Sequence, residues 1–579
     1  STTLPMPYNN TQVNKIFLIT ILILAAFLRF YNLATNPPSL NWDEASLGYN
    51  SWTLLKYGTD EYGNKWPFSI RSFNDYKPPL YSYLTMIPIA IFGLTEFSTR
   101  FISAFLGTLT VFVVFFLTKE FFPPQHTQKG DTQAIFQTKA LPLTASLLLA
   151  ISPWHLQFSR GAFEGNIAVF FTTTGLYFLL KWLRKQVTRD LVIATLSLTA
   201  SLYAYHAARL VIPLLGIIIL VRYHKKFIQK WKTTLLCALL VITALTPLVA
   251  ITLRGNLAAR ANAVSIFNKK YLPENIIQRE ISEKQKGNAL ISLWYDHRLQ
   301  YIPVIIKGYL NHYSIYHIFI AGDVVNRHHA PDMGLLYLIE LPFIVIGLAL
   351  QVKKSYKGKL IFWSWWLLAP LPAALASGTP HAIRSILWLP LPQIATAVGL
   401  IATLHLLSLY PAHSKSKNQH DQYSIFYRLH IYTLPAILVV LFIANITYYL
   451  IQYHIHQPVE NARHWQYGYK QMITAIKDIY PQFPQVLVTT ANDQPYIFFL
   501  FYEQYDLNKG ANPGDFNRFY KNIEFKAIDY LKERQREHIL IVGAGDEVPP
   551  GEPIPITEID YPDGTTAYRI FKRPPKIIY

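Results

Sequence analysis

Apolar segments about as long as a membrane is thick recur along most of this chain, and they constrain its fold more than any other feature. At roughly 1.5 Å per residue, a helix of about 20 apolar residues crosses a hydrocarbon core of roughly 30 Å and satisfies its own backbone hydrogen bonds. The 579 residues are 51% hydrophobic and only 15% charged. The sequence therefore predicts an all-α polytopic membrane protein.

The distribution of basic residues predicts the topology. The segment 79–95 is apolar but flanked by prolines and only marginally long, so by itself it could cross the membrane or lie on its surface. If it does not cross, every short loop rich in Lys and Arg falls on one side, as the positive-inside rule requires. We therefore expect segment 79–95 to be a juxtamembrane helix or re-entrant segment, with the N-terminus inside and the C-terminus outside. The eleven expected spans are 16–35, 98–118, 138–156, 163–181, 190–208, 209–221, 233–253, 333–352, 359–377, 383–409 and 429–452.

The net charge of +19 does not predict a nucleic-acid partner. The basic residues gather in short loops between apolar segments, where they act as topology signals and contact anionic lipids. The lipid bilayer is thus the expected partner, and a multi-pass protein of the plasma (cytoplasmic) membrane the expected location. The single cysteine, Cys237, excludes an intramolecular disulfide and a cysteine-rich metal site.

Two long segments and the C-terminal part stand out from the transmembrane pattern. We expect a transmembrane domain over 1–453, with outer loops at 36–97 and 254–330, and a small soluble α/β domain over 454–579 on the outer face. In that domain the pattern predicts helices over 465–479 and 494–505, a charged helix ending near Glu537, and strands over 486–490 and 539–542. Pro562-Asp563-Gly564 between two further strand-like runs indicates a hairpin.

The second outer loop is rich in histidine. His312, His317, His328 and His329 occur there with Asp323 and Asp332. Their spacing is not that of a zinc site, so we expect neither a bound metal nor a cofactor. Gly543-Ala544-Gly545 lacks the third glycine of a phosphate-binding loop, and we interpret it as a turn.

The expected topology brings a second group of residues, not used to choose it, to the outer face. One interpretation is that they are interfacial side chains and local ion pairs. The other interpretation is that they form one site, because several of these residues share a helical face with a charged or polar residue three or four positions away. Cations at the interface can bind the phosphate of a lipid whose tail lies in the bilayer, and a carboxylate can deprotonate an acceptor. The group consists of Asp43, Glu44, Lys77, Arg160, Glu164, Tyr205, His206, Arg209, His381 and Arg384, with Tyr76 beside Lys77.

Several of these motifs also carry a family resemblance over roughly residues 15–410. In chain order, they are Leu28-Arg29-Phe30-Tyr31-Asn32-Leu33, Trp42-Asp43-Glu44-Ala45, Lys77-Pro78-Pro79-Leu80-Tyr81, Arg100-Phe101-Ile102-Ser103-Ala104, Ser159-Arg160 with Glu164, and His381-Ala382-Ile383-Arg384. The chain resembles the C-type glycosyltransferases, and within them the branch of protein O-mannosyltransferases and bacterial lipid A aminoarabinose transferases.

The resemblance implies an inverting hexosyl or pentosyl transferase that uses a polyprenyl-phosphate-sugar donor and a protein, lipid or glycan acceptor. Asp43 would be the general base, with Glu44 beside it, and Glu164 would match the family's second outer acid. Lys77 and Arg384 would hold the donor phosphate, with Arg160 and Arg209 as further cations. Tyr76, Tyr205, His206 and His381 would complete the site.

The chain also departs from its relatives. Protein O-mannosyltransferases have His where Lys77 stands, and this chain lacks their inserted repeat domain, so the acceptor is open. Two other functions fit polar residues at helix ends: a polyprenyl-lipid flippase or transporter, and a non-catalytic membrane assembly scaffold. A transporter would be expected to place ionisable groups at mid-membrane or to interrupt paired helices with Gly and Pro. Few such interruptions stand out in this chain, and Pro370 and Pro372 are the main ones.

Overall fold

The computed structural model is mostly helical and divides into two compact units. The first consists of Ser1–Arg29, Phe105–Ser159 and Gly165–Leu450, and the second of Phe30–Ala104, Arg160–Glu164 and Ile451–Tyr579. The predicted domain boundary after residue 453 lies close to one of these divisions, but the second unit also contains the first predicted outer loop. The residues described are 10–73, 75–123, 138–253, 265–267, 274–287, 291, 294, 296–356, 358–409, 420–507, 518–548 and 555–573.

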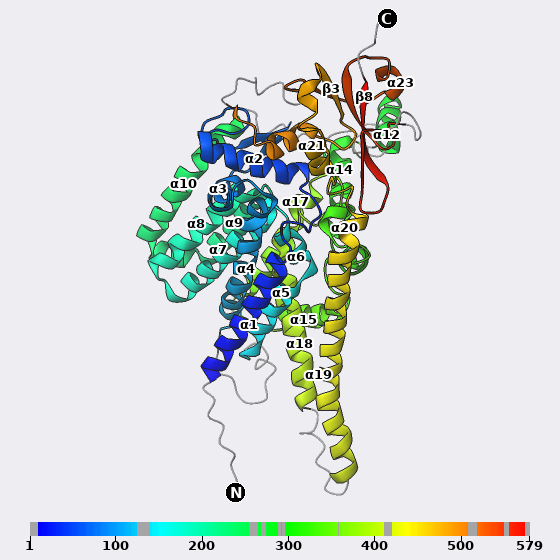
Figure 1. Ribbon diagram of the computed structural model, residues 1–579. Coiled ribbons are helices and arrows are strands. Elements are labelled where there is room, and N and C mark those ends of the chain that lie inside the picture. Colours follow the sequence, from blue (N-terminus) through cyan, green and yellow to red (C-terminus); the bar gives the residue numbers. More distant parts are fainter. Residues whose placement is uncertain are drawn as a thin grey trace, which may run out of the picture. The chain divides into compact units, whose positions relative to one another are not determined.

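The first unit is helical. Besides most of α1 (Asn10–Phe30) and the later part of α4 (Glu96–Phe121), it contains a long series of further helices (Figure 1). They are α5 (Ala140–Ile151), α6 (Pro153–Arg160), α7 (Glu164–Lys185), α8 (Thr188–Ala204), α9 (Ala208–Gln229), α10 (Trp231–Leu253), α12 (Glu274–Gln285), α14 (His297–Asn311), η3 (Tyr316–Ala321), η4 (Asn326–His328), α15 (Glu340–Lys353), α16 (Lys359–Leu368), α17 (Leu371–Ala374), η5 (Ile386–Trp388), α18 (Leu391–Leu409) and α19 (His420–Ile451).

Five helical segments of the described chain are long and apolar enough to cross a membrane. They coincide with five of the predicted spans, and the other six remain predictions. The most apolar stretch of the segment containing α19 is only 6% buried, so apolar side chains face outward there, as lipid contact requires. The five segments are Glu96–Phe121, Glu164–Lys185, Trp231–Leu253, Ile386–Leu406 and Thr433–Glu460.

Helices α15 and α18 pack closely because each has a glycine at their crossing. A Cβ atom added at Gly347 would collide with the carbonyl oxygen of Ala395, and one added at Gly399 with that of Phe343. The two backbones are therefore in direct contact, the kind of small-residue crossing that membrane helices use. Figure 1 shows the two helices side by side.

The second unit begins with the first predicted outer loop. It contains α2 (Trp42–Tyr57), a two-stranded sheet of β1 (Ile70–Ser72) and β2 (Asp75–Lys77), and α3 (Leu80–Phe92). Helix α3 has 13 residues and is therefore about 20 Å long, shorter than a hydrocarbon core. This length favours the expectation that segment 79–95 does not cross the membrane.

The C-terminal part of the second unit is built on a mixed sheet with the order β4-β5-β3-β6-β8-β7. Strand β3 is parallel to β5 and β6, whereas the other pairs are antiparallel. The strands are β3 (Gln485–Thr489), β4 (Phe519–Tyr520), β5 (Ile523–Lys526), β6 (Ile539–Ala544), β7 (Thr557–Asp560) and β8 (Thr566–Arg573). The helices are η7 (Gln452–His456), α20 (Gln457–Glu460), α21 (Tyr469–Ile476), η8 (Tyr480–Gln482), α22 (Pro495–Tyr502) and α23 (Tyr530–Glu533).

The hairpin predicted at Pro562-Asp563-Gly564 is confirmed by the pairing of β7 with β8. The charged helix predicted to end near Glu537 corresponds to α23, which ends at Glu533. Among the described residues from 518 to 537, α23 is the only helix. Strand β5 precedes it, and the buried residues of β5 alternate with the period of a strand.

One apolar core joins the first loop to the C-terminal sheet. Leu40, Ala45 and Tyr49, around and within α2, share it with Met472 of α21 and Val486 of β3. The Tyr49 hydroxyl donates to the Tyr505 carbonyl at 2.8 Å. Helix α2 is thus held from one side by the C-terminal part of the chain.

Candidate functional site

Helix α2 begins at a position that its own sequence determines. The Asn41 side-chain oxygen accepts hydrogen bonds from the backbone N–H groups of Asp43 (2.9 Å) and Glu44 (3.2 Å). In return, Glu44 Oε2 accepts from the Asn41 backbone N–H at 3.1 Å. This reciprocal pair is a capping box, which fixes the first turn of α2 and therefore the two neighbouring acids that it carries.

The Glu44 carboxylate is buried and bound by several donors. Arg100 donates from Nε to Oε1 at 2.9 Å and from Nη2 to Oε2 at 3.1 Å, a bidentate pair. The backbone N–H of Ala162 also donates to Oε1, at 2.8 Å. Side-chain exposure is 1% for Glu44 and 0% for Arg100.

The remaining donors of Arg100 hold the start of the first loop. Nη1 donates to the carbonyl oxygens of Leu33 (3.1 Å) and Pro37 (2.9 Å), and Nη2 donates to that of Ser39 (2.5 Å). Arg100 thus connects α4, α2 and the segment between α1 and α2. Arg100 belongs to one of the family motifs, but the sequence does not predict that it contacts the site.

The adjacent Asp43 has a different environment. Lys77 Nζ lies 2.5 Å from Asp43 Oδ1, and the Lys77 side chain is 4% exposed while that of Asp43 is 46% exposed. Lys77 is the last residue of β2, and its ammonium is 5.5 Å from the centre of the Phe73 ring. The structure therefore brings together the predicted acid and the predicted phosphate-binding lysine, and it leaves the acid accessible to a substrate.

Arg160 lies in the same unit. Its Nη2 donates to the backbone carbonyls of Tyr31 (2.7 Å) and Asn36 (3.0 Å), and its guanidinium carbon is 5.0 Å from the Tyr453 ring centre. Glu164, the first residue of α7, is partly buried. The ion pair expected between Arg160 and Glu164 remains a prediction.

Apart from Tyr76, the other predicted site residues belong to the first unit. Tyr205 is the C-cap of α8, and Arg209 lies one turn on, where its Nη1 is 3.0 Å from His206 Nδ1 and its Nε donates to the Leu202 carbonyl at 3.1 Å. Arg384 donates from Nη1 to the Ser377 carbonyl. His381 precedes it and is buried. The structure thus describes the predicted residues in two groups, and their assembly into one site remains a prediction.

A third acid of the first loop, Glu61, had no signal in the sequence. Its carboxylate oxygens are buried and have no hydrogen-bond partner among the described residues. Burial, with a contribution from the neighbouring Asp60, raises the pKa of Glu61 to about 8, although Lys77 acts in the opposite direction. Glu61 is therefore mostly protonated near neutral pH. Tyr76, next to Lys77 on β2, is half-buried and lies opposite Arg71 of β1.

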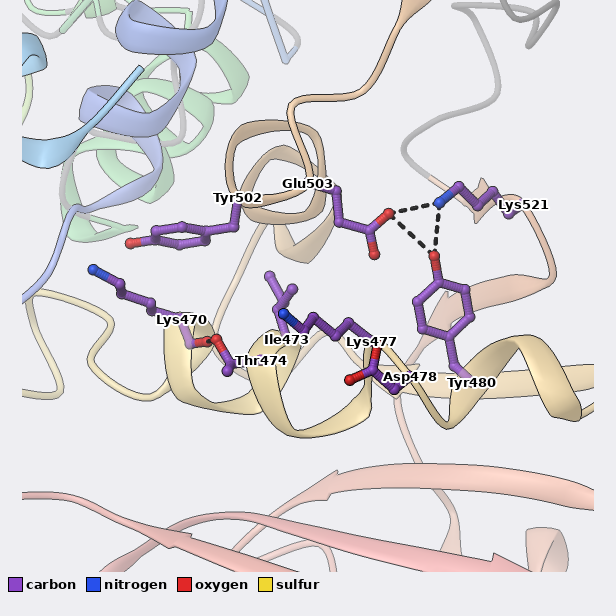
Figure 2. A pocket seen from close by; sticks show the side chains of 9 residues that line it. All are labelled: Lys470, Ile473, Thr474, Lys477, Asp478, Tyr480, Tyr502, Glu503 and Lys521. Carbon is purple, nitrogen blue, oxygen red and sulfur yellow. Dashed lines mark hydrogen bonds and ion pairs between the residues drawn. The ribbon is translucent and has the colours of Figure 1, made fainter. Parts of the chain in front are cut away.

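A pocket of about 530 Å³ lies in the C-terminal part of the second unit (Figure 2). Glu503 accepts hydrogen bonds there from Lys521 Nζ (2.6 Å) and the Tyr480 hydroxyl (3.1 Å), and Lys470 and Lys477 add two further cations. None of the residues predicted for the site lines this pocket.

Sequence comparison identifies no relatives: no family model matches the chain, and neither does any curated protein. Comparison of structures finds proteins with a similar fold. ArnT from Cupriavidus metallidurans in the apo state superimposes with a TM-score of 0.50 at 13% identity, over 97% of this chain and 98% of ArnT. The oligosaccharyltransferase AglB from Archaeoglobus fulgidus gives a TM-score of 0.49 at 14% identity, over 86% of this chain.

This chain covers different shares of the two similar structures: 64% of the length of AglB, but nearly the whole of ArnT. At such low identity the likeness concerns the fold and not the activity. In its fold, this chain is similar to the C-type glycosyltransferases, the superfamily that its sequence motifs resemble.

Proposed function

We propose that this protein is a membrane glycosyltransferase that moves a sugar from a polyprenyl-phosphate-linked donor to an acceptor. The observation that carries the proposal is the Asp43–Lys77 pair: a half-exposed carboxylate 2.5 Å from a buried ammonium, at the start of a capped helix. A carboxylate can take a proton from an acceptor, and an ammonium can neutralise a phosphate that leaves. The likeness of the fold to ArnT, a lipid A aminoarabinose transferase, supports the same class.

The proposed reaction is a single displacement with inversion. The acceptor hydroxyl, of a protein, lipid or glycan, gives its proton to Asp43 while its oxygen forms a bond to the anomeric carbon of the sugar. The bond between that carbon and the phosphate oxygen breaks, and polyprenyl phosphate departs with the electron pair. Lys77 stabilises the charge that develops on the phosphate.

Arginines are proposed to add to this phosphate site. Arg384 is the principal candidate, with Arg160 and Arg209 as further cations. Each already holds a backbone carbonyl, but a guanidinium carries five N–H donors, so such contacts are compatible with a phosphate contact. We assign Glu164 to orientation of the acceptor or sugar, and Tyr76, Tyr205, His206 and His381 to the walls of the site.

The contacts of Glu44 favour a structural role over the catalytic role that the motif implies. Both of its oxygens are occupied by Arg100, and Ala162 and Asn41 also donate to it. These donors occupy the lone pairs of both oxygens and leave none for the proton of a substrate. We therefore propose that Glu44 positions α2, whereas Asp43 contacts the substrate.

The proposed topology follows from the charge pattern of the sequence. Eleven spans place the N-terminus inside and put the site and the C-terminal domain on the outer membrane face. There the donor lipid would lie in the bilayer with its phosphate at the interface, where Lys77 can meet it.

The experiment that tests this function measures sugar transfer from radiolabelled polyprenyl-phosphate-sugar donors in proteoliposomes, with a crude membrane and protein extract as acceptor. Asp43→Asn is compared with the wild type and with Asp529→Asn. Asp529 is an exposed helix N-cap in the C-terminal part, and Asn caps equally well. We expect transfer in the wild type and in Asp529→Asn, and its loss in Asp43→Asn. Donor binding or movement across the bilayer without transfer from any donor would overturn the proposal and favour a transporter or scaffold.

A further inference from the structure

A buried cluster in the first unit combines one carboxylate with two imidazoles. Asp323 follows η3, His328 ends η4, and His381 lies in the segment before η5. One potential ligand atom from each residue lies within 4.8 Å of the others, and all three residues are buried. The first two are close in the chain, but His381 comes from a distant segment, so the spacing rules that apply to a sequence do not reveal the cluster.

The distances leave one ring nitrogen of the cluster unsatisfied. His328 Nδ1 is 2.7 Å from Asp323 Oδ2, a hydrogen bond, whereas His381 Nδ1 is 3.6 Å from the same oxygen. His381 Nδ1 is buried and has no hydrogen-bond partner in the described part of the chain. If His381 Nδ1 carried a proton, that N–H group would lack an acceptor. If it carried a lone pair instead, the lone pair would face the Asp323 carboxylate. A cation between the three side chains resolves this conflict, because it accepts lone pairs from the imidazoles and from the carboxylate.

The separations of the two imidazoles from Asp323 Oδ2 suit a small divalent cation. Ligands about 2.0–2.2 Å from a tetrahedral metal lie roughly 3.2–3.6 Å apart, which is the separation between Asp323 and His381. The His328 contact would open by less than about 1 Å as the bridging proton leaves. One carboxylate and two imidazoles form a donor set that suits Zn²⁺ and leaves a fourth position for water.

A second layer of contacts holds these ligands in place. The backbone N–H groups of Ala382 and Val325 donate to the two carboxylate oxygens of Asp323, at 2.6 and 3.2 Å. His312 Nε2 accepts from the His381 backbone N–H at 3.1 Å, while its Nδ1 is 2.7 Å from the Gly308 carbonyl, which fixes its tautomer. Such outer contacts orient ligands and are typical of metal sites.

We propose that Asp323, His328 and His381 form a divalent metal site, with Zn²⁺ as the cation that fits their donor set best. The bound metal joins the loop after η3 to the segment that contains Ala382 and Arg384. This inference reverses the expectation of no metal, which rested on spacing along the sequence. It does not depend on the proposed transferase activity.

Metal binding by the full chain, purified in detergent and stripped with a chelator, tests the proposal. Zn²⁺ is titrated by calorimetry, retained metal is counted by mass spectrometry, and Co²⁺ is added as a spectroscopic probe of tetrahedral coordination. We expect one tight Zn²⁺ per chain and a tetrahedral Co²⁺ spectrum. His381→Gln and Asp323→Asn should each weaken binding by at least about tenfold to a hundredfold, the range reported for changes even to second-shell partners.

The control is His224→Gln, which changes an exposed histidine of the same unit. It shows how much weak metal binding comes from the other histidines among the 18 in the chain. Asp323→Asn keeps an oxygen that can accept from Ala382, so it separates loss of the ligand from loss of the fold. Its Tm without metal should lie near that of the wild type, whereas Zn²⁺ should raise only the Tm of the wild type and of His224→Gln. The proposal is overturned if no tight site is found, or if both ligand variants bind as the wild type does.

Discussion

Two neighbouring acids on the first turn of α2 have opposite environments. Glu44 is 1% exposed and lies in a bidentate pair with the fully buried Arg100, whereas Asp43 is 46% exposed beside Lys77. One position along the helix therefore separates a carboxylate whose oxygens are occupied by protein donors from one that a substrate can reach. Both acids follow the same capping residue, Asn41, so the difference comes from tertiary contacts and not from the helix itself.

The comparison shows how a buried and fully bonded acid can fix the backbone that carries an exposed one. Arg100 fixes Glu44 and three backbone carbonyls of the preceding segment, so the first turn of α2 has little freedom. Asp43 inherits this fixed backbone while its own carboxylate remains exposed. Preorganisation of this kind lets a catalytic group act without reorganisation of its surroundings.

The largest expected effect is on turnover in Asp43→Asn. Removal of a general base typically lowers the rate by about 10²–10⁴-fold. Stability should fall less than in Arg100→Met, because Asn keeps an oxygen that the buried Lys77 ammonium can contact. Initial rates of transfer and thermal unfolding in detergent measure the two quantities. A rate within threefold of the wild type would remove Asp43 from the proposed chemistry.

Arg100→Met should give the opposite pattern, with a loss of stability. Removal of one partner of a buried ion pair leaves an uncompensated charge and costs about 3–5 kcal/mol. Arg100→Lys keeps the charge but not the bidentate geometry, and its stability should lie between those of the wild type and Arg100→Met. Unfolding by heat or denaturant in detergent provides the measurement. If Arg100→Met were as stable as Asp43→Asn, the distinction between the two pairs would fail.

The buried Glu61 sharpens the comparison, because it is an acid in the same loop without a partner for its carboxylate oxygens among the described residues. Its folded pKa of about 8 lies above that of an unfolded Glu, so the contribution of Glu61 to stability is greatest below about pH 4.5 and falls as the pH rises to 8. The slope is about 1.4 kcal/mol per pH unit for one proton. Glu61→Gln should flatten this slope in unfolding experiments between pH 5 and 8. An unchanged slope would mean that Glu61 has a partner in the folded protein.

The smallest effect is expected for donor binding in Lys77→Met. Loss of a charge-assisted contact to phosphate costs about 1.5–3 kcal/mol, roughly tenfold to a hundredfold in Kd. Equilibrium binding of a polyprenyl-phosphate-sugar donor in detergent measures it, with Lys572→Met, an exposed lysine of β8, as the control. Equal affinity in both variants would place the phosphate elsewhere.

Local patterns in the sequence predict part of this structure well. Five apolar spans and the hairpin around Gly564 each depend on residues close together in the chain. In these cases the signal is a period or a turn, and each acts over a few residues. Asp43 and Lys77 are expected at one site because of the motifs that suggest the family.

Other features depend on partners distant in the chain, and sequence reasoning missed them. Asp43 and Glu44 look equivalent until Arg100 and Ala162 are seen to occupy Glu44. Glu61 looks like an ordinary polar loop residue, although folding buries it. His381 lies far along the chain from Asp323, so no spacing rule could associate them.

The shared core of α2 and the C-terminal sheet limits how this protein can be divided or recombined. Tyr49 and Ala45 of α2 pack in the same core as Met472 and Val486, so a chain cut after residue 453 would expose the apolar side of the helix that carries Asp43. The C-terminal part is therefore not an interchangeable module. During evolution its inner surface can change only together with the face of α2 that it covers, and an exchange between relatives would have to carry both segments.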